Sequence, residues 1–524
     1  MQLTLLDWSV FFGYFVILAL SGWYLNRKQS NNSDDYFLAG NSMPVWAVAI
    51  SVLVTSQSAA TFLGGPDMGF RGNLTYLATN IGALIAALIV MKAMLPRYYE
   101  YKVTTVYGLL EQRFGTTAKN HAGKMYLFGR VFASGARLYM AALAVSMLIF
   151  NNIETTNVIL SILLLAGLGV SYTVVGGIRS VIYTDTVQGL VYVVAAFTVL
   201  IYLYLSMGVE LPVIIDALQN PIDGGPSKLL LFDFTTDFSS TGVFNMWSAL
   251  TGFVLLNIAA FGLDQDMTQR VLTCKDAKSG SKALFNSVLM VIPSMLIFIL
   301  IGFLLYIFYM RPDLYQPASQ LADSFQGEKI TVFMHYVLNE MPSGLRGLVV
   351  VGVIAAALST ITSGLNSMSS VLVADIYKPW KLARQAAVPE KHFVRAGQFG
   401  MLLTAMTLSA MAVLCFYWQK YSDMPLLAFA LSVMVFSYSG LLGVFFTALF
   451  TKRGNNLSVT ASLLAGFFVT LLMQPYLLQK ISPQLAALDL GFTWQLCIGT
   501  AVAFLVCISA SGTEPATTVT TQEA

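Results

Sequence analysis

The sequence predicts an all-α integral membrane protein with about thirteen transmembrane helices. Hydrophobic residues make up 56% of the 524 residues and charged residues only 10%, and the mean hydropathy is +0.71. A soluble domain carries roughly 25% charged residues, so this chain could not cover its surface for water. The composition excludes a soluble enzyme, a nucleic-acid-binding protein and a secreted disulfide scaffold, and it makes the lipid bilayer the expected partner of the surface.

Apolar runs give the number of spans, because a helix needs about 20 residues to cross the hydrocarbon core. Thirteen such runs cover residues 7–25, 44–69, 75–95, 126–150, 156–177, 182–207, 242–263, 283–310, 345–376, 396–417, 425–450, 457–478 and 490–510. The first is not expected to be a cleaved signal peptide, because Arg27 and Lys28 follow it and no Lys or Arg precedes it. We expect one transmembrane domain over residues 1–510 and a polar, disordered cytoplasmic tail over residues 511–524.

Basic residues predict how the chain is oriented. With the N-terminus outside, 21 of the 29 Lys and Arg residues fall at inner ends and loops, seven fall in outer loops, and Arg137 falls within a run. Since Lys and Arg accumulate on the cytoplasmic side of a membrane, we expect the C-terminus in the cytoplasm.

Asp185 stands near the cytoplasmic start of the sixth run, where a charge is costly to place. A carboxylate there suits a cation or proton site, and an interfacial residue that caps the helix together with Thr184 is an equally good interpretation of its position. The carboxylate is informative because few other charges lie within apolar runs.

The ninth run carries hydroxyl and amide groups along one face of the expected helix. The members of this stripe follow helical spacing, and they are Ser359, Thr362, Ser363, Asn366, Ser367 and Ser370. Hydroxyls can satisfy themselves on backbone carbonyls and small residues favour helix packing, but these roles explain only some of the stripe, and Thr360 adds to it. We favour a face that supplies oxygen ligands to an ion.

Two runs are interrupted by polar residues at corresponding places. The second contains Thr55-Ser56-Gln57-Ser58 in its middle, and the seventh contains Asn257 and then Gly262 before an acidic segment. Interrupted helices five spans apart are typical of transporters built from inverted repeats, in which freed carbonyls line the binding site. A helix that is merely kinked is the alternative for the second run.

Arg137 lies a turn or more inside the fourth run. Arginine stays charged in a protein, so it must reach the interface, pair with an acid or contact an anionic ligand. Both a snorkelling side chain and an anion contact fit its position. The sequence contains neither a phosphate-binding loop nor a zinc motif, and we expect a transporter rather than an enzyme, without an obligate protein partner.

Four segments together resemble the sodium:solute symporter family. They read DDYFLAG with the following TSQSAATFLGGP, YTVVGGIRSVIYTDTVQG, GLDQDMTQRVL and AAALSTITSGLNSMSSVLVADIY. The resemblance implies a leucine-transporter fold, with a 5+5 inverted repeat preceded by one helix and followed by two. It also implies a bacterial inner membrane as the location.

The family resemblance further implies sodium as the co-transported ion. A first site would use the carbonyls of Val54, Gln57 and Ala356 with the hydroxyls of Ser359 and Thr360. The sialic acid branch has a second site, whose matching positions are Asp185, Ser359, Thr362 and Ser363.

The solute is less well defined by the resemblance. The positions that match solute-binding residues of the family are Ser58, Thr61, Asn80, Arg137 and Asn257. In the sialic acid branch an Arg at the position of Arg137 holds the carboxylate of the solute. The position of Asn80 is a Gln in that branch. In the galactose branch the position of Ala260 is a gating Tyr. We expect import of a carboxylated or hydroxylated solute such as sialic acid, with a sodium–sugar symporter or a proton-coupled symporter that uses Asp185 as alternatives.

Overall fold

The structure is a computed structural model that describes residues 3–25, 32–321, 324–325, 328–329, 331–385, 387–419, 426–487 and 489–512. Helices account for nearly all regular structure in these ranges. The exceptions are two short antiparallel strands, β1 (Ser324–Phe325) and β2 (Glu328–Lys329). The predicted all-α class is confirmed, while the predicted disordered tail lies outside the described residues beyond residue 512.

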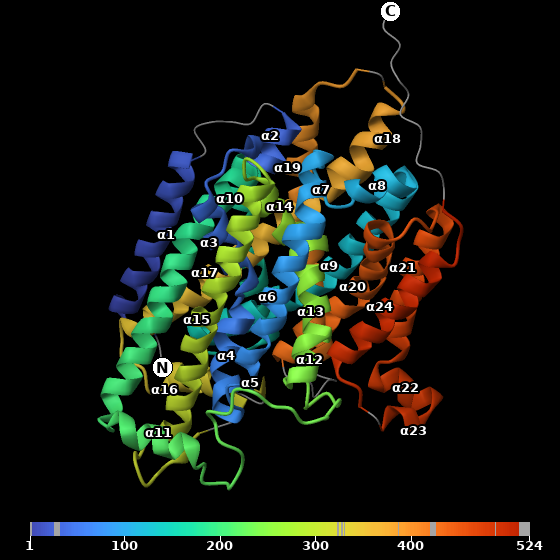
Figure 1. The fold of residues 1–524 in the computed structure, drawn as a ribbon. Helices are drawn as coiled ribbons and strands as arrows, with labels where there is room; N and C mark the ends of the chain where they lie inside the picture. The colour runs from blue at the N-terminus through green and yellow to red at the C-terminus, as the bar shows by residue number, and fades with distance from the viewer. Residues whose placement is uncertain are drawn as a thin grey trace, which may run out of the picture.

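Long apolar helices run between the two ends of the molecule (Figure 1). Most of them have more than 20 residues, and an α-helix satisfies its backbone hydrogen bonds internally in lipid. Their bounds are α1 (Leu5–Leu25), α9 (Thr116–Val145), α10 (Thr155–Met207), α15 (Ala277–Met310), α17 (Leu345–Val371), α19 (Glu390–Gln419), α20 (Leu426–Phe450), α21 (Asn456–Leu472) and α24 (Phe492–Ile508).

Shorter helices break the remaining spans or cover the ends. The broken spans contain α3 (Val45–Ser56) with α4 (Ala59–Arg71), then α5 (Thr75–Ala78), α6 (Asn80–Ile89), η2 (Val90–Met94) and α7 (Leu95–Glu100), and later α12 (Met246–Leu250), α13 (Gly252–Ile258), η4 (Ala259–Leu263) and α14 (Gln265–Leu272). The others are α2 (Ser33–Leu38), η1 (Ala39–Asn41), α8 (Gly108–Phe114), η3 (Ser146–Phe150), α11 (Leu211–Gln219), α16 (Val332–Asn339), η5 (Leu372–Tyr377), α18 (Lys378–Leu382), α22 (Pro475–Ile481) and α23 (Pro483–Ala486).

Eight helices in the described ranges are long and apolar enough to span a membrane, or nine with the bent pair Ser33–Asn41 and Val45–Ser56. Three further apolar helices of 10–17 residues are Met434–Phe450, Asn456–Leu472 and Phe492–Ile508. A polytopic helical protein is therefore confirmed. The number thirteen and the repeat arrangement stay predictions.

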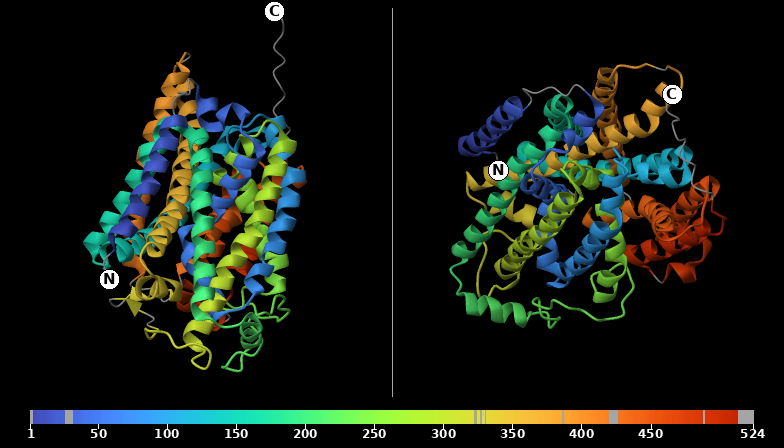
Figure 2. Two further views of the ribbon diagram at one scale, coloured as in Figure 1. Left: turned by 90° about the vertical axis from the view of Figure 1, so that its left-hand side faces the viewer. Right: turned by 45° about the horizontal axis from the view of Figure 1, so that its top comes forward.

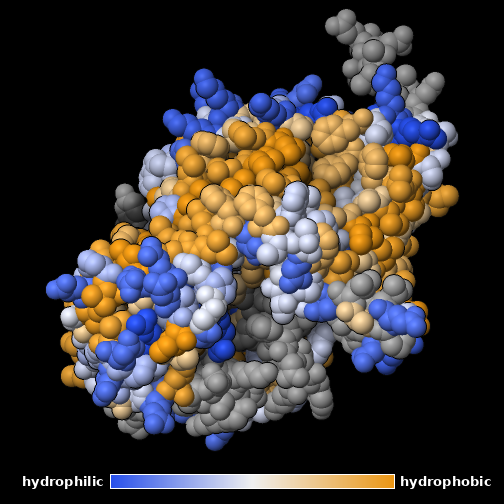
Figure 3. Space-filling view, turned by 60° about the horizontal axis from the view of Figure 1, so that its bottom comes forward, coloured by the Kyte–Doolittle hydropathy of each residue, from blue (hydrophilic) through white to orange (hydrophobic). Residues whose placement is uncertain are grey.

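On the face drawn in Figure 3, apolar side chains form a band between two more polar ends. Exposed large apolar side chains occur on the outer faces of α1, α10 and α19, where Leu20, Leu190 and Phe399 are 59%, 67% and 66% exposed. In contrast, α17 lies inside the bundle with nearly all its side chains buried, whereas the dark blue α1 lies at the edge of the bundle in the right-hand view of Figure 2. The lipid therefore contacts the outer helices, and α17 can carry polar groups away from it.

Two glycines set the backbone geometry around the core. At Gly177, φ is +56°, which breaks α10 and separates the fifth and sixth predicted spans. A Cβ at Gly69 would lie 2.3 Å from the carbonyl oxygen of Ile299, so glycine is what lets α4 approach α15 so closely. The close approach at Gly69 thus packs α4, the second half of the broken span, against α15.

Candidate functional site

The second predicted span is broken in the middle. Helix α3 ends at Ser56, Gln57 has extended dihedral angles (φ −93°, ψ 110°), and α4 begins at Ala59. The N–H of Ser58 donates to the Thr61 hydroxyl over 3.4 Å. Carbonyls at the end of a helix have no partner within that helix, so the break leaves oxygens near Val54 and Gln57 for other ligands. The predicted interruption of this helix is thus observed.

Asp185 is fully buried and accepts from three side chains on three helices. The Ser51 hydroxyl of α3 donates to it over 2.5 Å and the Ser359 hydroxyl of α17 over 2.7 Å. Its third partner is Arg270 of α14, with Nη2 at 3.2 Å from Oδ2. Asp185 therefore faces the protein interior, and the interpretation as an interfacial helix cap is wrong.

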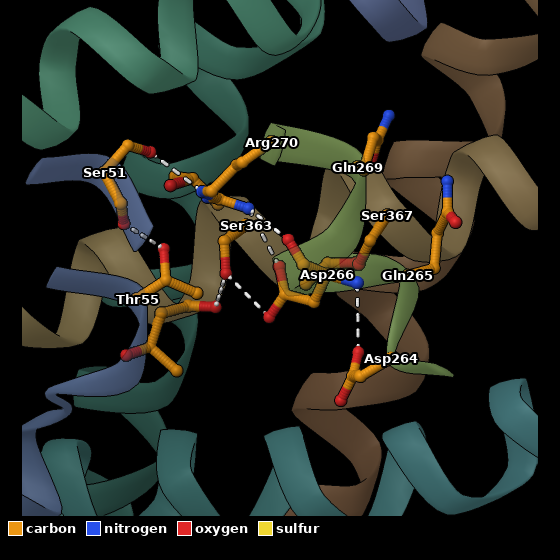
Figure 4. Close-up of polar contacts among 12 residues, drawn as sticks. Ser51, Thr55, Asp264, Gln265, Asp266, Gln269, Arg270, Ser363 and Ser367 are labelled. Atoms are coloured by element: carbon orange, nitrogen blue, oxygen red, sulfur yellow. Dashed lines mark hydrogen bonds and ion pairs between the residues drawn. The ribbon is translucent and has the colours of Figure 1, made fainter. Parts of the chain in front are cut away.

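Arg270 also reaches a second carboxylate. Its Nε donates to the Ser51 hydroxyl over 2.8 Å, and its Nη1 lies 3.1 Å from Oδ1 of Asp266, one turn earlier in α14. In Figure 4, Arg270 lies between Ser51 and Asp266, and Ser363 points at Asp266. The Ser363 hydroxyl donates to Asp266 Oδ2 over 3.0 Å. The broken α3 and the stripe on α17 thus meet at one polar centre.

The ion pairs continue to the far side of that centre. Arg130 of α9 pairs with both Asp266 and Asp264, and its Nη1 lies 2.8 Å from Asp264 Oδ2. Asp264 caps α14 by accepting from the N–H of Asp266, and it also accepts from the Tyr438 hydroxyl of α20 over 2.5 Å. We call the five charged residues Asp185, Arg270, Asp266, Arg130 and Asp264 the buried charge chain. It joins residues of α9, α10 and α14 through ion pairs.

Of this chain, only Asp185 stands out in the sequence. Arg130 and Arg270 are among the 21 basic residues that the sequence places at inner ends and loops, and Asp264 and Asp266 belong to the acidic segment that follows Gly262. The available signal was the mixed charge of DQDMTQR directly after a broken helix, because three charges within seven residues there need nearby partners. All four unrecognised residues are at most 4% exposed.

The predicted sodium ligands are partly brought together. Ser359 contacts Asp185, and the Thr360 hydroxyl donates to the carbonyl of Ala356 over 3.0 Å. The Thr362 hydroxyl donates to the carbonyl of Ser359, whereas Ser363 is turned toward Asp266. All of these α17 residues are at most 2% exposed, so none of their groups faces lipid.

The predicted solute-binding residues lie on four helices, and in the described part of the chain only Ser58 and Thr61 are joined to each other by a hydrogen bond. Asn80 donates to the carbonyl of Leu77 and Asn257 to that of Phe253, over 2.9 and 2.8 Å. Arg137 Nη2 contacts the Met434 sulfur over 3.2 Å. Among the described residues no carboxylate forms an ion pair with Arg137, so the interpretation as a contact to a protein acid gains no support.

A small cavity of about 10 Å³ lies beside the buried charge chain. Its lining includes Tyr126, Arg130, Asp264, Met434 and Tyr438, and that volume is close to the minimum for one water molecule. Met434 contacts both this cavity and Arg137. The cavity thus adjoins Arg130 and Asp264 of the charge chain, and Met434 connects its lining to Arg137.

Comparisons with known proteins agree with this arrangement. The model of the sodium:solute symporter family matches residues 36–466. The sodium/sialic acid symporter SiaT of Proteus mirabilis is 28% identical over 89% of this chain and 89% of its own length. The sodium/sialic acid symporter NanT of Aliivibrio fischeri is 26% identical over 96% of this chain and 92% of its own length.

Solved transporter structures share the fold. A substrate-bound, outward-open Na⁺-coupled sialic acid symporter has a TM-score of 0.79 at 23% identity, over 97% of this chain and 99% of that one. A closed nucleobase-cation-symport-1 family transporter has a TM-score of 0.57 at 15% identity, over 92% of this chain and 95% of that one. With the family model covering most of its length, this chain belongs to the sodium:solute symporter family, and it is a membrane transporter rather than an enzyme.

Proposed function

We propose that this protein couples the inward movement of sodium to the import of a small carboxylated and hydroxylated solute such as a sialic acid. The observation that carries the proposal is the balance of buried charge. The charge chain contains three carboxylates and two guanidinium groups, which leaves one negative charge, and Arg137 supplies one positive charge that the described residues do not pair. A cation and an organic anion together would match this arrangement.

The first proposed sodium site uses the carbonyls of Val54, Gln57 and Ala356 with the hydroxyls of Ser359 and Thr360. The break after Ser56 supports it, because it frees carbonyl oxygens opposite the polar face of α17. The second proposed site uses Asp185, Ser359, Thr362 and Ser363. The 2.7 Å contact between Ser359 and Asp185 supports this site, and ion binding there requires Ser363 to turn away from Asp266.

The solute would lie beside Arg137, with Ser58, Thr61, Asn80 and Asn257 supplying hydroxyl and amide groups. A guanidinium binds a carboxylate through two parallel hydrogen bonds, which gives both affinity and orientation. The relatives named as sialic acid symporters support this solute class. A sodium–sugar symporter is the alternative, but a neutral sugar would leave the Arg137 charge without a counterion.

Coupling follows from the placement of the ion ligands on both α17 and the broken helix. An ion held by both elements organises the solute site, and by linkage the solute raises the affinity for the ion by the same factor. A membrane potential of 100 mV adds about 2.3 kcal/mol for each charge moved inward. No covalent step is required.

The proposed arrangement has thirteen spans with a 5+5 inverted repeat, an outer N-terminus and a cytoplasmic C-terminus in a bacterial inner membrane. Residues 1–510 would form one transmembrane domain. Figure 1 supports the odd number of spans, because α1 begins near the lower end of the molecule and α24 ends near the upper one. The upper end also carries the basic segments around α7, α8 and α18, as expected for the cytoplasmic side.

Uptake into proteoliposomes tests the proposal. We expect labelled sialic acid to accumulate under an inward sodium gradient, and accumulation to stop when choline or K⁺ replaces Na⁺. If uptake is unchanged without sodium but follows a pH gradient, the coupling ion is a proton carried on Asp185 rather than sodium.

A further inference from the structure

A cavity at the proposed cytoplasmic end lies apart from the buried charge chain. Its volume is about 480 Å³, and it is formed by the end of α7, by α8 and by the end of α20 with the residues that follow it. Three basic side chains line it: Arg97, Arg113 and Lys452. Tyr101 and Phe450 line it as well, and they are 45% and 61% exposed. It thus combines three positive charges with exposed aromatic rings.

The two arginines are held in place by the backbone of α20. Arg97 Nη1 donates to the carbonyl of Leu449 over 3.3 Å, and Arg113 Nη2 donates to the carbonyl of Thr451 over 2.6 Å. Each guanidinium has five N–H donors, so most of its donors stay available after capping this helix end. No ion pair connects these arginines or Lys452 to a carboxylate within the described ranges. The local charge is therefore positive and lacks an acidic partner there.

The depth of the cavity restricts what can reach it. Arg97 lies in the last helix of one apolar span and Lys452 directly follows another, so the cavity is at the level of the lipid headgroups. Exposed aromatic residues are typical of this interface. Basic pockets between transmembrane helices on the cytoplasmic side suit phosphate-bearing headgroups. A soluble anion would use the charges but gain nothing from the exposed rings.

We propose that this cavity binds the phosphate headgroup of an anionic phospholipid of the cytoplasmic leaflet, with phosphatidylglycerol as the representative. The phosphate would contact Arg97, Arg113 and Lys452, while the acyl chains follow the apolar surface beside Phe450. The bound lipid would then connect α7 and α8 to the end of α20. Since α20 also carries Tyr438, which bonds to Asp264, the lipid would stabilise the position of a helix that contacts the buried charge chain.

The test is the thermal stability of the purified full-length protein in a neutral detergent, titrated with defined additives. We expect phosphatidylglycerol to raise the melting temperature in a saturable manner. Phosphatidylcholine, and inorganic phosphate at the same concentration, should leave it unchanged. Equal stabilisation by phosphatidylcholine would overturn the proposal, because it requires no basic site. Equal stabilisation by inorganic phosphate would assign the cavity to a soluble anion and would also overturn it.

Substitutions test whether the stabilising lipid binds at this cavity. The Lys452 side chain forms no hydrogen bond with the described residues, so Lys452→Gln should preserve folding, and we expect about fivefold weaker lipid binding. The double substitution Arg97→Lys and Arg113→Lys keeps both positive charges but removes the planar guanidinium groups, which can form two parallel hydrogen bonds to a phosphate. The matched control removes three exposed lysines from the same end, Lys275→Gln, Lys278→Gln and Lys282→Gln, and should bind lipid as the wild type does. Wild-type lipid binding by Lys452→Gln, or equal loss in the control, would contradict the assignment.

Discussion

Asp185 and Arg270 form a fully buried ion pair, with Asp185 Oδ2 lying 3.2 Å from Arg270 Nη2. Both residues also contact Ser51, and Arg270 continues to Asp266. A buried ion pair contributes little net stability, because desolvation offsets the attraction, but losing one partner is costly. The pair therefore makes the carboxylate that we assign to sodium binding sensitive to the position of α14.

Replacing Asp185 by Asn should abolish the sodium stimulation of uptake and lower stability. The neutral Asn side chain cannot balance the charge of a sodium ion. Arg270 then keeps Asp266 as its one remaining ion-pair partner among the described residues. Breaking a buried pair costs about 3–5 kcal/mol, and Asp266 should reduce that loss. Proteoliposome uptake and the melting temperature measure the two effects. Asp375→Asn removes another buried carboxylate, one that accepts from Thr105, and it should keep sodium stimulation. Equal behaviour of the two variants would contradict a specific role for Asp185.

Replacing Thr360 by Ala should weaken sodium binding with little loss of stability. Among the described residues its hydroxyl bonds only to the carbonyl of Ala356 in its own helix, so the fold loses about 1 kcal/mol or less. The sodium concentration for half-maximal uptake should rise several-fold. Thr447→Ala is the matched control, because the Thr447 hydroxyl makes the same type of bond to Gly443 in α20. A rise of equal size in the control would show a general effect of removing a buried hydroxyl.

Replacing Arg137 by Gln should reduce affinity for a carboxylated solute. A hydrogen bond to a charged group contributes about 1.5–3 kcal/mol, which corresponds to roughly 10- to 150-fold in affinity. Competition for uptake by the acid and by its neutral methyl ester gives the measurement. In the wild type the acid should compete better, and in Arg137→Gln the two should become similar. An unchanged preference for the acid would remove Arg137 from the solute site.

The burial of Lys228 leads us to expect that the stability of the protein depends on pH in the alkaline range. It lies in the loop after α11, where its Nζ donates to the carbonyls of Phe70 and Gly72 over 2.8 and 3.1 Å. Burial lowers the pKa of Lys228 from 10.5 to about 8. Between these values the unfolded chain binds a proton that the folded protein does not, so stability should rise with pH in that window. The neutral amine retains two N–H donors for the two carbonyls.

The measurement for Lys228 is the melting temperature from pH 7.5 to 10, compared with that of Lys228→Met. The wild type should gain stability relative to the variant as the pH rises. A relative loss over this range would mean that the carbonyls require the charged ammonium.

Asp7 lies far from the proposed sodium sites, and we expect its substitution to change the stability of the protein. Its Oδ1 accepts from the backbone N–H groups of Gly344 and Gly347 over 2.7 and 2.8 Å, at the start of α17. Removing a helix cap costs about 0.5–2 kcal/mol. Asp7→Ala should lower the melting temperature, and Asp7→Asn, which keeps one acceptor oxygen, should lower it less. Sodium affinity should stay at the wild-type value in Asp7→Asn.

The helical class, the apolar runs and the break at Gln57 were predictable because lipid imposes simple rules on the chain. A span needs about 20 apolar residues, and four polar residues in its middle need partners. The stripe on α17 was predictable for the same reason, since Ser359 to Ser370 share one face of a single helix. Local patterns of this kind hold whatever the packing.

The partners of these groups were not predictable from the sequence. Arg130 and Arg270 appear as ordinary basic residues at inner helix ends, yet both turn inward and are at most 4% exposed. Ser363 was expected beside Asp185 and instead donates to Asp266. Which carboxylate a side chain meets depends on how α9, α14 and α17 pack, and the spacing of residues along one helix carries no information on that.

The most direct test of sodium coupling is equilibrium binding of radioactive sodium to the purified protein, with and without sialic acid. The account predicts saturable binding that sialic acid tightens, and that weakens in Thr360→Ala and again in Asp185→Asn while Thr447→Ala binds as the wild type does. Sodium binding that is indifferent to both site substitutions, or to the solute, would contradict it.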